Sequence, residues 1–181
     1  MCIRDRGEFD GHAINVFGGI PGEVVDAEIY RYRRRKKRVI AAMVVKVIRP
    51  SKHRENPPCR YFGPCSGCQW QHIRYPHQLS LKRKMVEDQL MEYPLLADVS
   101  VRNVIPDSNQ LGYRNHARFA VRYGGQIGFS NRITRRFVRI DHCKLMDKKI
   151  NESLKKLQGL VCETSNLSVR VGVHTSDSLI Q

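Results

Sequence analysis

The sequence lacks the apolar segments that membrane insertion and secretion require. No apolar run approaches the roughly 20 residues needed to cross a bilayer, and no basic, apolar and small-residue signal peptide opens the chain. We therefore expect a cytoplasmic protein with no membrane partner. The chain has six cysteines, and because thiols stay reduced in the cytosol, those that lie close together are expected to bind metal rather than to form disulfides.

Acidic residues are also scarce. Only 17 Asp and Glu stand against 32 Lys and Arg, which gives a formal net charge of +15 over 181 residues. A domain this basic usually binds a polyanion, most often nucleic acid. The hydrophobic fraction of 41% excludes a disordered chain, and the length suits one large domain or two small ones.

The first 50 residues predict a small β domain behind a short leader. The opening MCIRDR resembles translated adapter sequence, so we expect residues 1–7 to be a non-native leader. Over residues 8–50, short apolar strands alternate with glycine turns at Gly18-Gly19 and Pro21-Gly22. This pattern is typical of a small β-barrel of the OB type.

A basic run separates the last two predicted strands of this domain. Packing seven like charges together costs self-repulsion unless a polyanion relieves it, so the run predicts a hairpin that contacts phosphates. A solvated hairpin tip is the alternative. The residues concerned are Arg31, Arg33, Arg34, Arg35, Lys36, Lys37 and Arg38.

Residues 51–92 predict a linker, a cysteine-rich loop and a helix. The prolines of the linker forbid a helix or a central strand. From Pro76 to about Tyr93 the pattern is helical, because Leu79, Val86 and Leu90 recur at i, i+7 and i+11.

Residues 93–181 predict a central α/β domain with an antiparallel sheet. A glycine turn at 124–125 joins two strands into a hairpin, and Asp147 is placed to cap a second helix. The strands are expected at 99–105, 116–123, 126–129, 136–140 and 167–174, with no return strand after the last.

A second set of basic residues in the central domain is a candidate RNA surface. The set comprises Arg114, Arg118, Arg132, Arg135 and Arg136. Tyr30, Tyr32 and Phe129 lie near one or other basic set and could stack on unpaired bases, although Phe129 suits the hydrophobic core equally well.

Three cysteines fall within ten residues, spaced Cys59-x5-Cys65-x2-Cys68. Small and turn-forming residues between them let the backbone wrap tightly and bring three sulfurs together. Soft thiolate sites usually close with four cysteines. Cys143, at a predicted strand end, is better placed as the further ligand than Cys162, which we expect to be a buried inert thiol.

The identity of the metal stays open on the residues alone. Structural zinc sites usually consist of two paired knuckles, whereas three clustered ligands and one distant ligand are more typical of an iron–sulfur cubane. His72 and His142 could serve as zinc ligands, but we expect both to be surface side chains.

The cysteine segment resembles the cluster motif of the 23S rRNA (uracil-5-)-methyltransferase family. The similar residues are the three cysteines with the following Gln-Trp-Gln-His-Ile-x-Tyr, then Gln78-Leu79-x-x-Lys82 and Val86. Tyr113-Arg114-Asn115 and Ile140-Asp141-His142-Cys143 match further landmarks in order. Ser66 departs from the pattern, because members typically have glycine there.

This resemblance implies a specific architecture and cofactor. It implies that residues 8–50 are a TRAM domain and that Cys59, Cys65, Cys68 and Cys143 bind a 4Fe–4S cluster. It also implies a Rossmann-type catalytic domain that binds S-adenosylmethionine. The sequence contains no G-x-G-x-x-G for such a domain. We therefore expect an inactive N-terminal portion of the enzyme, without catalytic residues.

Two further expectations concern partners and rivals. The RNA is expected to be ribosomal, with transfer RNA as the second choice, and the chain is expected to be monomeric. The alternative function is a non-enzymatic RNA-binding protein with a structural zinc site. Methylthiotransferases also combine a TRAM domain with a cluster, but their C-x3-C-x2-C motif and domain order both differ.

Overall fold

The computed structural model describes residues 5–34, 37–131, 133–172, 174–175 and 177–181. Its contacts divide the chain into two compact units. The first unit comprises Met1–Pro57 and Gln69–Pro106, and the second comprises Pro58–Cys68 and Asp107–Gln181. The cysteine loop therefore groups with the central part of the chain, whereas the helix that follows it groups with the N-terminal sheet. The range 51–92 expected from the sequence keeps the cysteine loop and this helix together.

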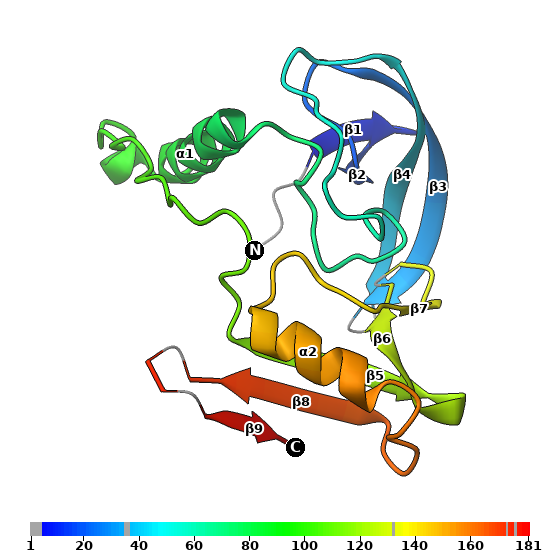
Figure 1. Cartoon of the computed structure of the whole chain (residues 1–181). Coiled ribbons are helices and arrows are strands. Elements are labelled where there is room, and N and C mark those ends of the chain that lie inside the picture. Colours follow the sequence, from blue (N-terminus) through cyan, green and yellow to red (C-terminus); the bar gives the residue numbers. More distant parts are fainter. Residues whose placement is uncertain (1–4, 35–36, 132, 173, 176) are drawn as a thin grey trace. The chain divides into compact units, whose positions relative to one another are not determined.

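The first unit is built on a curled four-stranded sheet, in which the long strands β3 and β4 are strongly bent (Figure 1). The sheet order is β1-β2-β4-β3, with β2 and β4 parallel and the other pairs antiparallel. Within the described residues the sheet keeps two edges, so it is a half-barrel rather than a closed barrel. The strands are β1 (Asp5–Phe9), β2 (His12–Phe17), β3 (Val24–Arg34) and β4 (Lys37–Arg49).

The basic run forms the end of the β3–β4 hairpin, as predicted. The register pairs Arg33 with Arg38 and Arg34 with Lys37. Arg35 and Lys36 lie outside the described residues, as do the side chains of residues 32–38. Arg31 is exposed. The backbone of β1 begins at Asp5, so the strand includes the end of the segment expected to be a leader.

The predicted helix after the cysteine loop is confirmed as α1 (Tyr75–Met91). Pro76 lies in its first turn, where the missing N–H costs nothing. The ion pairs Arg83–Glu87 and Lys84–Asp88 lie on its surface at i, i+4 spacing.

A short 3-10 helix, η1 (Pro94–Leu96), follows α1. The strand expected at 99–105 is wrong, because those residues have no strand conformation and no neighbouring strand to pair with. Strand propensity without a pairing partner does not form a strand.

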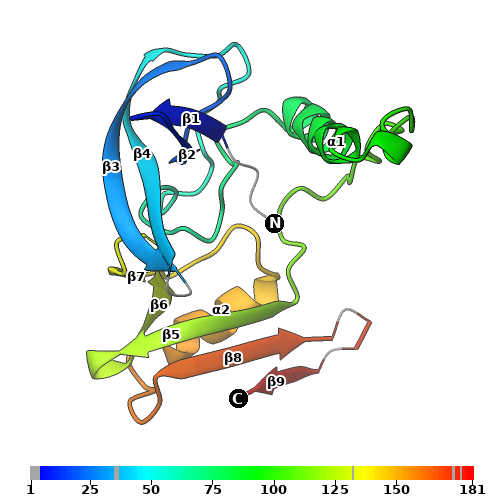
Figure 2. The same ribbon diagram turned by 180° about the vertical axis from the view of Figure 1, so that it is seen from behind.

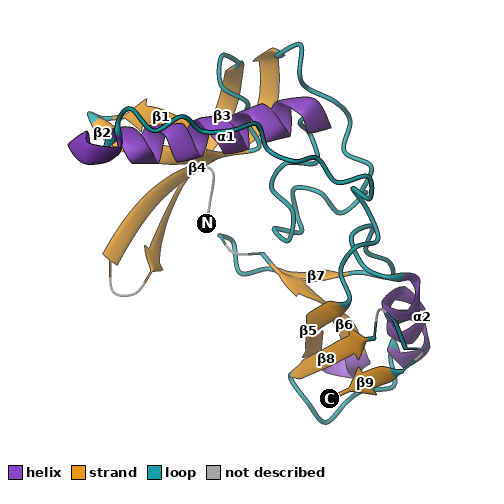
Figure 3. Cartoon of the chain, turned by 90° about the vertical axis from the view of Figure 1, so that its left-hand side faces the viewer, coloured by secondary structure: helices purple, strands orange, loops and turns teal. Residues whose placement is uncertain are grey.

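The second unit packs a helix on one face of an antiparallel five-stranded sheet. The views from front, back and side agree that α2 (Lys148–Leu157) covers a single face (Figures 1, 2 and 3). The sheet order is β7-β6-β5-β8-β9. The strands are β5 (His116–Arg122), β6 (Gln126–Ser130), β7 (Phe137–Arg139), β8 (Asn166–Val171) and β9 (Ser178–Ile180), and η2 (Tyr123–Gly125) joins β5 to β6.

The core of the second unit follows the alternation of its strands. Ala117, Phe119 and Val121 of β5 point inward, and Ile150 and Leu154 of α2 meet them. Asp147 caps α2 as predicted, because its Oδ1 accepts a hydrogen bond of 2.7 Å from the backbone N–H of Lys149. The glycine turn is also confirmed: Gly124 and Gly125 both have a φ of 69°.

One strand of the sheet was not expected. β9 pairs antiparallel with β8, so the prediction of no return strand is wrong. Its three residues are too few to show an alternating pattern, and they become a strand only by pairing with β8.

Candidate metal centre

Two tight turns wrap the cysteine loop of the second unit. The N–H of Phe62 donates to the Cys59 carbonyl at 3.0 Å, and the N–H of Cys65 donates to the Tyr61 carbonyl at 2.8 Å. Gly63 takes a φ of 93°, which glycine adopts without strain. The loop thereby folds back on itself between its first and second cysteine.

Cys143 approaches the same site from a distant part of the chain. It lies between the buried Ile140 and the cap of α2. The thiol of Cys143 interacts electrostatically with those of Cys65 and Cys68, as does the thiol of Cys59. The four cysteines selected from the sequence are therefore brought together in one unit.

The four thiols are half-buried, and burial disfavours the charged form of two of them, Cys65 and Cys68. Burial is the largest cause that raises the pKa of Cys68, to about 11, and the neighbouring thiols raise it further. Burial also raises the pKa of Cys65, against a hydrogen bond from the N–H of Gly67. The positive charge of the Arg114 guanidinium opposes the rise of both pKa values but does not reverse it. Such a set of half-buried thiols beside one cation suits a soft metal or a cluster.

The exposure of the cysteines separates Cys162 from the other four. Among the described residues all five cysteines are free thiols, and Cys162 alone is exposed. The expectation that Cys162 is buried is therefore wrong. Within the same described part of the chain, no three His, Cys, Asp or Glu side chains converge closely enough to hold a single metal ion.

An exposed hydrogen bond and an ion pair connect the cysteine loop to the segment that precedes Cys143. The Tyr61 hydroxyl donates to Oδ1 of Asp141 at 2.5 Å, and Arg60 forms an ion pair with the same carboxylate. The hydrogen bond from Tyr61, followed by that from Arg60, lowers the pKa of Asp141. A cleft of about 370 Å³ opens here, lined by Pro58, Cys59, Arg60, Tyr61, Asp141, His142 and Lys144.

Ser66 does not disturb the loop. Asp10 and Arg135 are the two non-glycine residues with positive φ in the described part of the chain, so Ser66 avoids the left-handed region. Gly67 is more restricted, because a Cβ there would lie 3.4 Å from the Cys65 sulfur.

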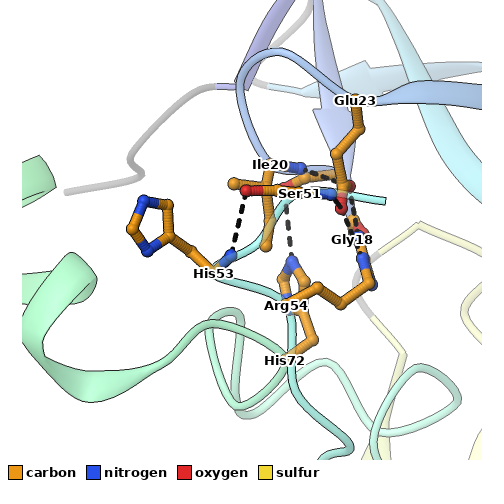
Figure 4. A network of polar contacts seen from close by, with 8 residues as sticks. Gly18, Ile20, Glu23, Ser51, His53, Arg54 and His72 are labelled. Carbon is orange, nitrogen blue, oxygen red and sulfur yellow. Dashed lines mark hydrogen bonds and ion pairs between the residues drawn. The ribbon is translucent and has the colours of Figure 1, made fainter. Parts of the chain in front are cut away.

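His72 belongs to the first unit, whereas the four thiols belong to the second. The expectation that it is a surface residue is wrong, because it is buried and its Nε2 lies 3.2 Å from the Gly19 carbonyl (Figure 4). His142 is exposed, as expected.

Glu23 and Arg54 form the main polar network of the first unit (Figure 4). The Glu23 carboxylate accepts from Arg54 at 2.5 and 2.6 Å, and from the backbone N–H groups of Ile20 and Ser51 at 2.9 Å each. Arg54 also donates to the Gly18 carbonyl at 2.7 Å. The network joins the glycine turn after β2 to the segment that leads towards the cysteines.

The charged form of Glu23 is favoured despite its burial. Burial alone would raise the pKa of Glu23, but the hydrogen bonds from Arg54, Ser51 and Ile20 outweigh it and lower the pKa below its ordinary value. The network therefore requires an ionised carboxylate.

The other candidate RNA residues, from both units, differ in burial and in their contacts. Arg118, Arg135 and Arg136 are exposed, and Arg132 lies outside the described residues. Arg114 is half-buried beside the thiols. Phe129 packs against the core, with its ring centroid 5.3 Å from that of Phe119. Tyr30 donates to Glu28, and the side chain of Tyr32 is outside the described part.

The open face of the second sheet carries the predicted Arg118 together with three arginines that the sequence reasoning missed, Arg122, Arg139 and Arg170. Alternation along β5 places Arg118 and Arg122 opposite the core face, and the register places Arg139 and Arg170 on that same side. All four side chains are exposed. The alternation of residues 167–174 was recognised as a strand signal, and it could also have assigned Arg170 to the outer face.

The comparisons with known proteins point to one family. The 23S rRNA (uracil(1939)-C(5))-methyltransferase RlmD of Pseudomonas savastanoi pv. phaseolicola is 31% identical over 164 residues, which cover 84% of this chain and 34% of that protein. The protein of the same name from Halomonas elongata is 34% identical over 155 residues, covering 83% and 31%. No family model matches the chain.

A solved structure shares the fold. The tRNA (uracil-54, C5)-methyltransferase of Pyrococcus abyssi, in complex with S-adenosyl-L-homocysteine, aligns with a TM-score of 0.60 and 23% identity. The alignment covers 94% of this chain and 42% of that one. None of the described helices is long and apolar enough to span a membrane.

These matches define the class of protein. The chain is a homologue of the N-terminal portion of RNA uracil-C5 methyltransferases of the RlmD type. It spans about a third of the length of the curated relatives that it matches.

Proposed function

We propose that this chain supplies RNA binding and a 4Fe–4S cluster to an S-adenosylmethionine-dependent RNA (uracil-5-)-methyltransferase. The observation that carries the proposal is the meeting of Cys59, Cys65, Cys68 and Cys143, from two distant segments, in a family of RNA uracil methyltransferases. The curled sheet with its glycine turns supports a TRAM assignment for the first unit. Binding of the methyl donor and catalysis are assigned to the remainder of such an enzyme.

The donor set favours a cluster over a single zinc ion. Three of the cysteines are clustered at C-x5-C-x2-C spacing and the fourth is distant in sequence, whereas structural zinc sites usually consist of two paired knuckles. The four thiols interact with one another within one unit. A cubane needs a wider set of four thiolates and would supply a rigid anchor between loop and sheet.

The cluster is tested by anaerobic purification. The wild-type chain and the Cys162→Ala variant should be brown, with about four irons per chain, in line with a cubane held by four thiolates. Cys143→Ala should lose the cluster. A colourless protein that carries one zinc ion would favour the alternative, a non-enzymatic RNA-binding protein with a structural zinc.

The RNA partner is proposed to be ribosomal, as in the names of the curated relatives, with transfer RNA as the second choice. The basic β3–β4 hairpin would supply affinity and the second unit would supply placement. Each phosphate contact adds about 0.7 to the salt slope for single-stranded RNA. Reversing Arg33, Arg34 and Arg35 to Glu should therefore flatten log K against log salt by about two units. An unchanged slope would show that the hairpin is a solvated tip that does not contact the RNA.

The isolated 181-residue chain is proposed to be inactive as a monomer. Calorimetry should detect no binding of S-adenosylmethionine, and radiolabelled donor should transfer no methyl group to RNA. Micromolar binding of the donor would contradict this assignment.

A further inference from the structure

Asn151 fixes the backbone of Cys143 from the first turn of α2. Its Oδ1 accepts a hydrogen bond of 2.8 Å from the Cys143 N–H, and its Nδ2 lies 3.1 Å from the Cys143 carbonyl. The same Nδ2 also lies within 3.1 and 3.2 Å of the Met146 and Asp147 carbonyls. The side chain contacts the peptide groups on both sides of Cys143, so it restricts where that residue can point.

Asn131 makes the corresponding connection for the cysteine loop. Its Nδ2 donates to the Pro64 carbonyl at 2.8 Å, next to Cys65 in sequence. Its Oδ1 accepts from the backbone N–H groups of Ile133 and Thr134 at 2.9 Å each. One amide therefore shapes the turn after β6 and ties the loop to it.

Both asparagines are nearly inaccessible to solvent. Asn131 is 4% exposed and Asn151 is 8% exposed, and they are the buried asparagines of the described part of the chain. A polar side chain is retained in such a position only when its hydrogen bonds are satisfied. Both use the carbonyl oxygen and the amide nitrogen, so both need the full amide group.

We propose that Asn131 and Asn151 are positioning residues for the cluster, which set the separation between Cys143 and the loop thiols before any iron binds. This inference rests on the proposed function, because it presumes that the four thiols hold a cluster. Four thiolates repel one another, so the protein must hold them together until iron compensates their charge. A neutral amide provides both a donor and acceptors without adding a further charge.

Substitution by aspartate removes the N–H donor of each amide and keeps an acceptor oxygen, so it tests the donor separately. Asn131→Asp keeps the acceptor for Ile133 and Thr134 but places a carboxylate oxygen against the Pro64 carbonyl. Asn151→Asp keeps the acceptor for Cys143 N–H and loses the donor to three carbonyls. Groups that orient metal ligands typically alter metal affinity by about 10–100-fold when they are replaced.

The experiment reconstitutes each protein anaerobically with ferrous iron and sulfide and follows cluster loss to a chelator. Asn166→Asp, an exposed position in the same unit, controls for the added charge. Leu154→Ala, in the buried core beside Asn151, controls for lost stability. Iron per chain, the loss rate, the electron paramagnetic resonance spectrum of the reduced cluster and the unfolding midpoint of the apoprotein are measured together.

The expected result is a cluster that leaves about 10–100-fold faster, with an altered spectrum, in Asn131→Asp and Asn151→Asp. Asn166→Asp and Leu154→Ala should keep the wild-type rate and spectrum. Loss rates that track the unfolding midpoint across all variants would overturn the inference and assign the asparagines to stability alone. If Asn151→Asp does not fold, Asn131→Asp decides the outcome. A wild-type chain that takes up no cluster would overturn the proposed function together with this inference.

Discussion

Replacing Glu23 with Gln should unfold the first unit at a much lower temperature. The carboxylate side chain is 1% exposed and accepts four hydrogen bonds, two from Arg54 and two from backbone N–H groups. Glutamine retains one acceptor oxygen but turns an NH₂ group towards donors that it cannot satisfy. The Arg54 guanidinium then keeps its charge without its partner.

The burial and hydrogen bonds of Glu23 set the size of the expected loss in the free energy of unfolding. Removing one partner of a buried ion pair costs about 3–5 kcal/mol. The Arg54 side chain is 21% exposed, so water compensates part of the loss, and the remaining amide oxygen compensates more. We expect about 2–4 kcal/mol. For a domain of fewer than about 100 residues, each kcal/mol moves Tm by about 4–8 °C, so Tm should fall by roughly 8–32 °C.

The single tryptophan makes this loss measurable. Trp70 is half-buried and belongs to the first unit, so its fluorescence reports the unfolding of that unit during a thermal scan. Glu55→Gln is the matched control, because Glu55 is exposed, adjacent to Arg54, and loses the same charge. If Glu23→Gln melts within about 3 °C of Glu55→Gln, the reasoning about this network is refuted.

Three further predictions test the electrostatics. The lowered pKa of Glu23 means that its stabilisation is complete above about pH 4.5 and is lost as the pH falls through the lowered native value; the Tm difference between wild type and Glu23→Gln should therefore shrink as pH falls from 7 to 3, and a constant difference would contradict it. Among the five described cysteines of metal-free protein at pH 7, iodoacetamide should modify the exposed Cys162 first and Cys68 last, because burial raises the pKa of Cys68 to about 11; equal labelling by mass spectrometry would argue against this order. Reversing Arg118, Arg122 and Arg170 to Glu should flatten the salt slope of RNA binding by about two units, whereas Lys155→Glu with Lys156→Glu, on α2 at the other face, should not.

The features that the sequence predicted correctly are those with local causes. The α2 helix needs only its apolar spacing and the Asp147 cap, and the β5–β6 hairpin needs only Gly124 and Gly125 between two alternating runs. Strand β9 and the false strand at 99–105 show the opposite case, because each depends on whether a neighbouring strand is present to pair with.

The candidate cysteine ligands could be predicted from the sequence, but the residues proposed to position them could not. Spacing and family resemblance single out Cys59, Cys65 and Cys68, and Cys143 follows from its landmark. The residues that hold them, Asn131 and Asn151, are ordinary asparagines in the sequence. Their role depends on which carbonyls the fold brings within hydrogen-bonding distance, 67 positions apart in the case of Asn131 and Pro64.

Arg114 shows why composition alone cannot assign a basic residue to RNA. The sequence groups it with Arg118 and Arg136 as a phosphate contact. Its backbone pairs with the segment after Cys143, through bonds of 2.8 Å to Leu145 and from Asp147, and its half-buried guanidinium opposes the rise in the pKa of Cys65 and Cys68. A half-buried guanidinium beside these thiols is less accessible to a phosphate than the exposed Arg118 of β5. Replacing Arg114 with Gln should therefore weaken the cluster more than it weakens RNA binding.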